Sequence, residues 1–110
     1  MGVRLVADTL QNESDILVRL VGEIDLATFD DLRLALRPHV KPKATVVLDL
    51  AGVTFLSAAG ARLLVEAHEN LRSLGGRLLL WRPHPSAERT LRIAYPDKLP
   101  IQHGKLPQLS

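Results

Sequence analysis

The segment 45–64 (TVVLDLAGVTFLSAAGARLL) constrains the fold of this chain most, because an apolar strand runs through a short turn directly into a helix. Residues 44–50 are almost continuously apolar and contain one acid, Asp49, a pattern typical of a central strand buried on both faces. A Gly-Gly pair ends the helix predicted over 58–74. Its predicted apolar face is formed by Ala59, Leu63, Leu64, Ala67, Leu71 and Leu74. Because the first N–H groups of a helix lack internal partners, the start of this helix favours anionic groups.

The remaining segments alternate between strand and helix patterns. We expect strands at 3–8, 15–24, 77–81 and 99–102, with a hairpin turn over 11–15, and further helices at about 28–36 and 85–94. Thr28 with Asp31 three residues later resembles a capping box at the start of the first helix. The sequence therefore predicts an α/β fold with a mixed, mostly parallel sheet of four to five strands packed against three to four helices.

Length and composition indicate one domain. With 110 residues, of which 46% are hydrophobic, the chain can form a single core over 1–110, and we expect residues 104–110 to be a flexible tail. The absence of cysteine excludes disulfides and thiolate metal sites. No segment has the length of a signal peptide's apolar region or of a membrane span, so we expect a cytoplasmic protein without membrane insertion.

Catalytic and nucleic-acid-binding patterns are absent from the sequence. The basic residues of the second half are scattered singly without interleaved aromatic residues, so no nucleic-acid partner is expected. The serines lack the context of a nucleophile elbow, and no P-loop is present. No metal-ligand spacing occurs among the four histidines, which are expected on the surface: His39, His68, His84 and His103. We therefore expect no enzyme activity, no catalytic residue, no metal and no cofactor.

Three sequence fragments together resemble a known family. These are Gly-Glu-Ile-Asp at 22–25, Val-Val-Leu-Asp-Leu-Ala-Gly-Val-Thr-Phe at 46–55, and Leu-Gly-Gly at 74–76. In this order and at these spacings they resemble the STAS domain over nearly the whole chain. That resemblance implies a bacterial anti-sigma factor antagonist, which in its unphosphorylated form binds an anti-sigma factor kinase of the GHKL type and frees a sigma factor.

One departure from the family lies at the start of the central helix. Antagonists usually carry Asp-Ser-Ser/Thr-Gly there, and the hydroxyl residue before the glycine accepts phosphate. This chain reads Ser57-Ala58-Ala59-Gly60, so the phosphoacceptor position is Ala59 and lacks a hydroxyl. If the binding surface is otherwise intact, Ala59 implies an antagonist locked in its binding form, a decoy for a kinase, or a module controlled by another route. We expect the first, which is partner binding that does not depend on phosphorylation. Ser57 is interpreted as a helix N-cap, with a relocated phosphosite as its alternative, and Thr54 is a weaker candidate for such a site.

The same resemblance predicts the partner-binding surface, which comprises loop 52–57 and the first turns of the helix at 58–65. The expected contact residues are Asp25, Thr54, Ser57, Ala58, Ala59, Gly60, Ala61 and Arg62. Small side chains there would let a partner approach closely, and Arg62 would pair with an acid of the partner. The alternative interpretation is that the small residues only let the helix pack against its own sheet. Asp49 is interpreted either as an exposed strand-end acid or as a paired structural one, and Asp25 as a turn or cap residue; neither is interpreted as catalytic.

Two other roles are known among STAS proteins and stay open at this point. One is a subunit of a phospholipid-transport ABC complex, whose partner is an ATPase subunit. The other is a scaffold module of stressosome-like particles. A homodimer that pairs through the first strand is a further alternative.

Overall fold

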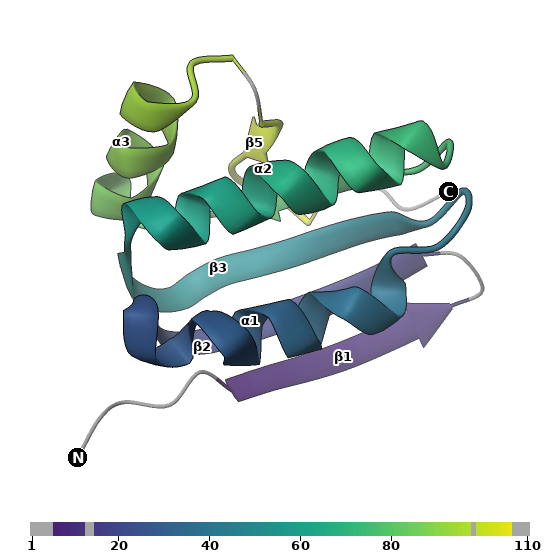
Figure 1. Cartoon of the computed structure of the whole chain (residues 1–110), viewed down its shortest axis with the longest axis horizontal. Coiled ribbons are helices and arrows are strands. Elements are labelled where there is room, and N and C mark those ends of the chain that lie inside the picture. The colour runs from purple at the N-terminus through teal and green to yellow at the C-terminus, as the bar shows by residue number, and fades with distance from the viewer. Residues whose placement is uncertain (1–5, 13–14, 98, 107–110) are drawn as a thin grey trace.

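The structure, a computed structural model, describes residues 6–12, 15–97 and 99–106 as one five-stranded sheet with three α-helices (Figure 1). The strands are β1 (Val6–Asn12), β2 (Asp15–Ile24), β3 (Thr45–Leu56), β4 (Arg77–Trp81) and β5 (Ile101–Gln102). The helices are α1 (Phe29–Leu36), α2 (Ala58–Ser73) and α3 (Pro85–Ala94), and two short 3-10 segments are η1 (Leu26–Thr28) and η2 (Arg37–His39).

The strands lie in the order β1-β2-β3-β4-β5, with β1 antiparallel to β2 and the other neighbours parallel. Each crossover connection therefore places the next strand at the same edge of the growing sheet, so that β3, β4 and β5 follow β2 in one direction. Because such crossovers are right-handed, their helices fall on one face of the sheet. In Figure 1, α1 and α2 lie in front of the sheet, and α3 packs against α2 and β3. The predicted fold, a mixed and mostly parallel sheet with helices, is confirmed.

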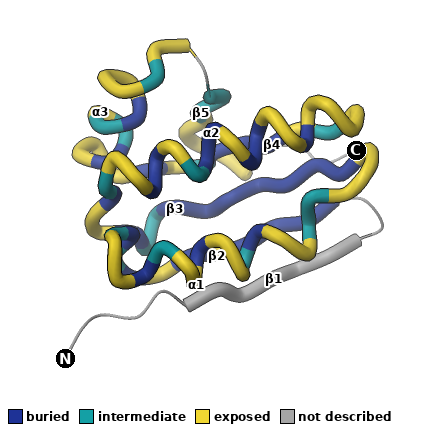
Figure 2. The backbone as a smooth tube through the Cα atoms, in the orientation of Figure 1, coloured by how far each residue is buried: buried dark blue, intermediate teal, exposed yellow. Residues whose placement is uncertain are grey.

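Both faces of β3 are buried, as its apolar sequence predicts. Side chains alternate between the two faces of a strand. On the helical face, Val46 and Leu48 belong to the main core with residues of all three helices. On the opposite face, Val47 packs with Leu17 of β2 and Leu79 of β4, and Trp81 borders this smaller cluster. Figure 2 shows β3 as a nearly continuous buried strand between half-exposed helices.

Several element bounds differ from those expected. Strands 15–24 and 77–81 match the structure, but β3 continues to Leu56 instead of ending at residue 50. The reason is that β2 still pairs with β3 after β4 has ended, through Val21 with Gly52 and Ile24 with Leu56. Strand β1 continues to Asn12, beyond the expected end at residue 8, and residues 3–5 of the expected first strand lie outside the described residues. So do residues 13–14 of the hairpin turn and 107–110 of the expected tail.

The predicted capping box of Thr28 with Asp31 is wrong. Thr28 precedes α1 but makes no side-chain bond to cap it. Instead, Thr28 and Asp25 form a capping box around η1: the Asp25 carboxylate accepts from Thr28 N–H at 3.1 Å, and Thr28 Oγ1 accepts from Asp25 N–H at 3.0 Å. The box lies three residues earlier because the chain leaves β2 through a 3-10 turn before the α-helix begins.

The buried face of α2 is also rotated from the predicted one. Ala59 and Leu74 are exposed, whereas Ala61, Val65 and His68 are buried. The prediction that His68 lies on the surface is therefore wrong. Its ring lies on the buried side of the helix, one turn before Leu71. Burial lowers the pKa of the imidazole, and the positive charge of Arg72 lowers it further by a smaller amount.

Gly76 provides a test of this packing, because β4 starts against the backbone that precedes β3. A Cβ at Gly76 would lie 2.2 Å from the carbonyl oxygen of Ala44, a backbone atom that cannot move aside without separating the strands. We expect Gly76→Ala to lower the free energy of unfolding by about 1–3 kcal/mol, measured by urea denaturation. The exposed neighbour Arg77 supplies the control, since Arg77→Ala should change stability by less than about 0.5 kcal/mol. Equal stability of Gly76→Ala and wild type would contradict the close strand packing.

Candidate partner-binding surface

The junction between β3 and α2 is shaped by two register shifts against β2. One lies between the pairs Arg19–Asp49 and Val21–Gly52, and the other between Gly22–Val53 and Glu23–Phe55. In each, β3 carries one residue more than β2, which is a β-bulge and redirects the side chains that follow. The second shift leaves Thr54 and Phe55 both exposed, although consecutive residues of a regular strand point to opposite faces.

Ser57 ends the strand and caps the helix. Its N–H donates to Ile24 O at 2.8 Å, which completes the β2 pairing, and its hydroxyl accepts from Gly60 N–H at 3.1 Å. Its backbone is extended, as at a typical N-cap. The sequence-based interpretation of Ser57 as the N-cap is confirmed.

The four small residues that follow divide into two pairs. Ala58 and Ala59 are exposed, whereas Gly60 and Ala61 are buried. A Cβ at Gly60 would lie 2.4 Å from Ile24 Cγ2 and 3.0 Å from Leu56 Cδ1, so the helix start packs tightly against the ends of β2 and β3. The interpretation that small residues let the helix pack against its own sheet thus holds for Gly60 and Ala61, whereas Ala58 and Ala59 are accessible, as a partner-binding role would require. Gly60 and Ala61 hold the helix on its sheet, and Ala58 and Ala59 form accessible surface.

Two large apolar side chains are exposed beside this pair and were not anticipated from the sequence. Leu26 is 85% exposed and Phe55 is 50% exposed. Ile24 of β2 is paired with Leu56 of β3. Leu26 lies two residues after Ile24, and Phe55 lies immediately before Leu56. These segments, η1, the end of β3 and the start of α2, meet at one end of the sheet (Figure 1). Contiguous exposed apolar side chains on a soluble domain mark interaction sites.

The polar candidates occupy the edges of this surface. Thr54 is exposed, and its hydroxyl donates to Gly22 O at 3.4 Å. Asp25 is half-buried, with its carboxylate held in the η1 capping box. Arg62 is exposed but already forms an ion pair with Glu66, one turn along α2, at 3.4 Å between Nε and Oε2. These side chains therefore border the apolar surface.

Asp49 lies on the helix-free face, where β4 ends and β3 continues alone with β2. Its side chain is only 1% exposed. Arg82 donates two hydrogen bonds to the carboxylate, from Nε at 3.0 Å and from an Nη atom at 2.9 Å, and Ala51 N–H donates a third at 3.0 Å. Arg19 lies 3.5 Å away from the β2 side, and the Arg82 guanidinium stacks over the ring of Trp81. The interpretation of Asp49 as a paired structural acid is confirmed.

The electrostatic balance at Asp49 favours the charged form. Burial alone would raise the pKa of this carboxyl, but the hydrogen bonds from Arg82 and Ala51, with the charges of Arg82 and Arg19, lower the pKa below its usual value. The adjacent carbonyl of Ala51 accepts a hydrogen bond from His84 Nε2 at 2.7 Å. Asp49 and His84 thus satisfy backbone groups of β3 at the point where it loses β4 as a neighbour.

Within residues 6–12, 15–97 and 99–106, no group of three or more His, Asp or Glu side chains is arranged to hold a metal ion. None of the helices found in those ranges has the length and apolarity needed to cross a membrane.

The fold and this site define a STAS domain. The family model of the STAS domain matches residues 7–102, and the chain belongs to this family. An anti-sigma-B factor antagonist of Bacillus subtilis is 31% identical over 86 residues, which cover 78% of this chain and 76% of that protein. An anti-sigma F factor antagonist of Lysinibacillus sphaericus is 22% identical over 81 residues, covering 72% and 69% of the two chains.

Solved structures agree with this assignment. An anti-sigma factor antagonist from Mycobacterium paratuberculosis superposes with a TM-score of 0.76 at 26% identity, covering 88% of this chain and 84% of that one. The unphosphorylated form of the anti-sigma factor antagonist SpoIIAA has the same fold, with a TM-score of 0.75 at 15% identity over 91% and 89% of the two chains. The relatives are thus named as regulators that act on anti-sigma factors.

Asp49→Asn tests the ionic contacts at the end of β4. Asparagine keeps the shape but removes the charge, so we expect a loss of about 1–2 kcal/mol of unfolding free energy at pH 7, a modest value because Arg82 is partly solvated. Since the folded-state pKa of Asp49 is lowered, its contribution is complete above the unfolded value of about 3.9 and disappears as the pH falls through the folded value. Urea denaturation should therefore show the two proteins converging in stability below about pH 4.

The exposed acid Asp30, which pairs with Arg33 at 3.0 Å, provides the matched control. Asp30→Asn should change stability by less than about 0.5 kcal/mol at pH 7, because both partners are solvated. A difference between wild type and Asp49→Asn that stays constant down to pH 2 would contradict the charged, arginine-paired state of Asp49.

Proposed function

We propose that this protein is an antagonist that binds an anti-sigma factor of the GHKL kinase type through the exposed surface at the start of α2, without being phosphorylated at the family's usual position. The observation that carries the proposal is the exposed Ala59, which occupies that position in a strand-to-helix junction that retains Gly60 of the family motif. The names of the curated relatives, both antagonists of anti-sigma factors, support the class of partner.

The surface has properties suited to protein binding. Leu26 and Phe55 offer exposed apolar area, and the short side chains of the exposed Ala58 and Ala59 would let a partner contact the backbone of the first helical turn closely. Aromatic residues such as Phe55 are enriched at protein interfaces. Asp25, Thr54 and Arg62 would supply the polar rim.

Loss of phosphorylation follows from the chemistry of the residues. Alanine has no oxygen that can accept a phosphoryl group. In a family member with a hydroxyl here, phosphate would add a charge of about −1.5 to −2 in the middle of an apolar contact. The two nearby hydroxyls have structural hydrogen bonds, Ser57 with Gly60 N–H and Thr54 with Gly22 O. The proposed protein therefore stays in its binding form, and its activity would be set by its abundance or by another input.

The proposal has two consequences for the cell. The protein would act by occupying its partner, so that a sigma factor is released, and it would catalyse no reaction. It would also work in the cytoplasm, because bacterial transcription occurs there. The phospholipid-transport and scaffold roles remain the alternatives, and identification of the partner distinguishes all three.

The first experiment is co-purification of the tagged full chain from its native cells, with bound proteins identified by mass spectrometry. We expect an anti-sigma factor with a GHKL kinase domain. A transporter ATPase subunit as the specific partner would contradict the proposal.

The second experiment uses that purified partner and isothermal titration calorimetry. Ala59→Asp puts a charge in the exposed apolar surface, and we expect its affinity to fall at least tenfold, or about 1.4 kcal/mol. Ala94→Asp introduces the same charge at an exposed alanine of α3 and should bind like wild type. Unchanged affinity of Ala59→Asp would exclude this surface.

The third experiment measures phosphate transfer. After incubation with the partner and ATP, wild type should gain no phosphate by intact-mass analysis, whereas Ala59→Ser, which restores the hydroxyl at the family's position, should gain one. Stoichiometric phosphorylation of wild type at Ser57 or Thr54 would contradict a phosphorylation-independent antagonist.

A further inference from the structure

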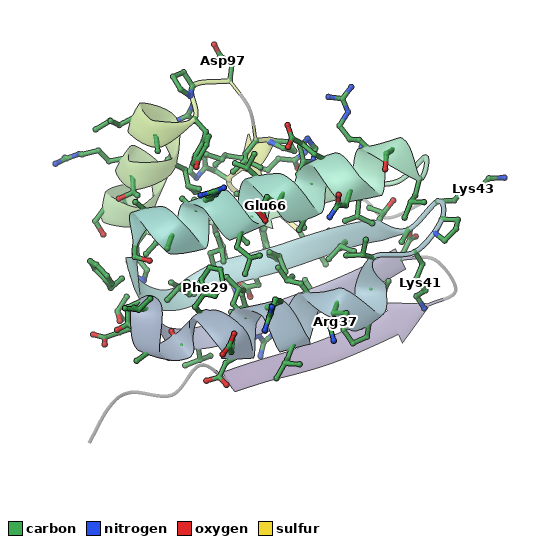
Figure 3. The ribbon with its side chains drawn as sticks, in the orientation of Figure 1. Phe29, Arg37, Lys41, Lys43, Glu66 and Asp97 are labelled. Carbon is green, nitrogen blue, oxygen red and sulfur yellow. The ribbon has the colours of Figure 1, made fainter. Side chains whose placement is uncertain are left out.

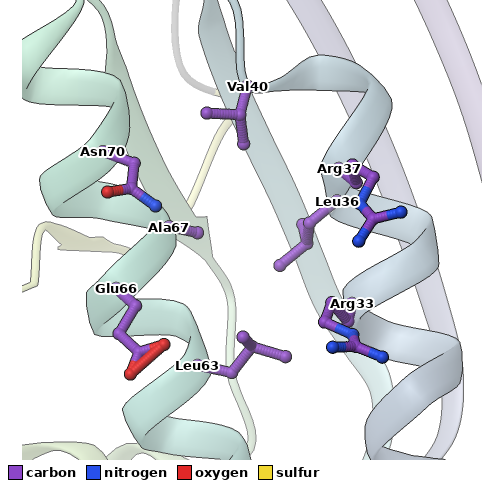
Figure 4. A pocket seen from close by; sticks show the side chains of 8 residues that line it. All are labelled: Arg33, Leu36, Arg37, Val40, Leu63, Glu66, Ala67 and Asn70. Atoms are coloured by element: carbon purple, nitrogen blue, oxygen red, sulfur yellow. The ribbon is translucent and has the colours of Figure 1, made fainter.

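A groove separates α1 from α2 on the outer side of the helical layer (Figure 4). Its volume is about 420 Å³. The side chains of Leu36 and Leu63 point toward each other across it, and Val40 and Ala67 continue the apolar floor. The rims are polar: Arg33 and Arg37 belong to the α1 side, and Glu66 and Asn70 to the α2 side.

The charge of this groove is predominantly positive. The one acid of the rim, Glu66, is paired with Arg62. Arg33 contacts the exposed Asp30, and within residues 15–97 and 99–106 Arg37 has no ion-pair partner. The chain then continues from Arg37 into the exposed Lys41 and Lys43 at the end where α1 leads into β3 (Figure 3). Cationic side chains beside an apolar floor favour a ligand that is both apolar and acidic.

We propose that the groove binds an acidic amphipathic helix of a protein partner. Arg33 and Arg37 are four residues apart, so their positions lie about 6 Å apart along α1. Leu63 and Asn70 span about 10 Å of α2, which is roughly two helical turns. A helix of two to three turns therefore matches the groove, with apolar residues at spacings of three and four on the floor and carboxylates one turn apart facing the two arginines.

This groove is a second surface, distinct in chemistry from the surface at the end of the sheet. The latter is apolar and small, whereas the groove combines an apolar floor with arginines. The two adjoin along α2, because Ala59 and Leu63 lie one turn apart on the same side of the helix. The inference does not depend on whether an anti-sigma factor is the partner, since the groove can be tested with a peptide alone.

The probe is a synthetic 14-residue helical peptide. Leucines at positions 4, 7 and 11 form its apolar face, and glutamates one turn apart from each other lie beside that face. It is titrated into the ¹⁵N-labelled full chain, and backbone amide shifts are recorded. We expect shift changes concentrated at 33–40 and 63–70, with an affinity that weakens at least fivefold between 50 and 300 mM NaCl because exposed charges are screened. A peptide with lysines in place of the glutamates should bind at least tenfold more weakly.

Variants of the protein separate the groove from overall charge. The double variant Arg33→Glu with Arg37→Glu should lose at least tenfold in peptide affinity. Arg89→Glu with Lys105→Glu makes the same change in net charge at exposed positions away from the groove and should lose less than threefold. All four positions are exposed, so the folded state of each variant can be checked from its amide spectrum.

Four results would overturn the inference. The first is the absence of shift changes at 1 mM peptide, and the second is equal binding of the lysine and glutamate peptides. The third is a set of changes centred on Leu26 and Phe55 instead of the groove. The fourth is concentration-dependent self-association of the free chain through 33–40 and 63–70, which would make a second copy of the chain the occupant.

Discussion

The parallel pairing of β2 with β3 continues past the end of β4, and the proposed partner-binding surface depends on it. The last pair between β3 and β4 is Asp49 with Trp81, whereas β3 keeps its pairing with β2 from Gly52, opposite Val21, to Leu56, opposite Ile24. The last bond of this pairing, from Ser57 N–H to Ile24 O, fixes where α2 begins. If the two strands separated there, the exposed apolar residues and the first turn of α2 would lose their common support.

Side-chain contacts reinforce this pairing from both faces. On the helical face, Gly60 lets α2 approach Ile24 and Leu56 so closely that a methyl group has no room. On the other face, Asp49 draws together arginines from β2 and from the residue after β4. The first contact needs a residue without a side chain, and the second needs a buried charge fully hydrogen-bonded. Both requirements are characteristic of positions that fix a single local geometry. Here they fix the direction in which the end of β3 points.

The sequence predicts regular elements well and the site only in part. Strands 15–24 and 77–81 were predicted with the observed bounds, and Ser57 was recognised as the N-cap, because period, turn residues and capping are local properties. The exposure of Phe55 depends on a bulge, which changes side-chain direction without a sequence signal of its own. The burial of His68 depends on which side of α2 faces the sheet, and the Asp25–Thr28 box depends on a 3-10 turn. These are consequences of tertiary packing.

The division of the small residues at the start of α2 connects the structure to the proposed function. Gly60 and Ala61 are buried, so packing against the sheet limits the size of their side chains. Ala58 and Ala59 are exposed, so packing within the described part of the molecule does not limit the size of theirs. A hydroxyl at position 59 would fit sterically, because the residue is exposed. Under the proposed function, its absence would therefore change regulation without altering the support of the surface.

The most direct test of this account follows the complex with the anti-sigma factor over time by size-exclusion chromatography, once with ATP and once with a non-hydrolysable ATP analogue. If the exposed Ala59 makes binding independent of phosphorylation, the fraction of complex will stay the same in both samples over hours. Loss of the complex in ATP alone, together with a gain of one phosphate on this chain, would contradict it.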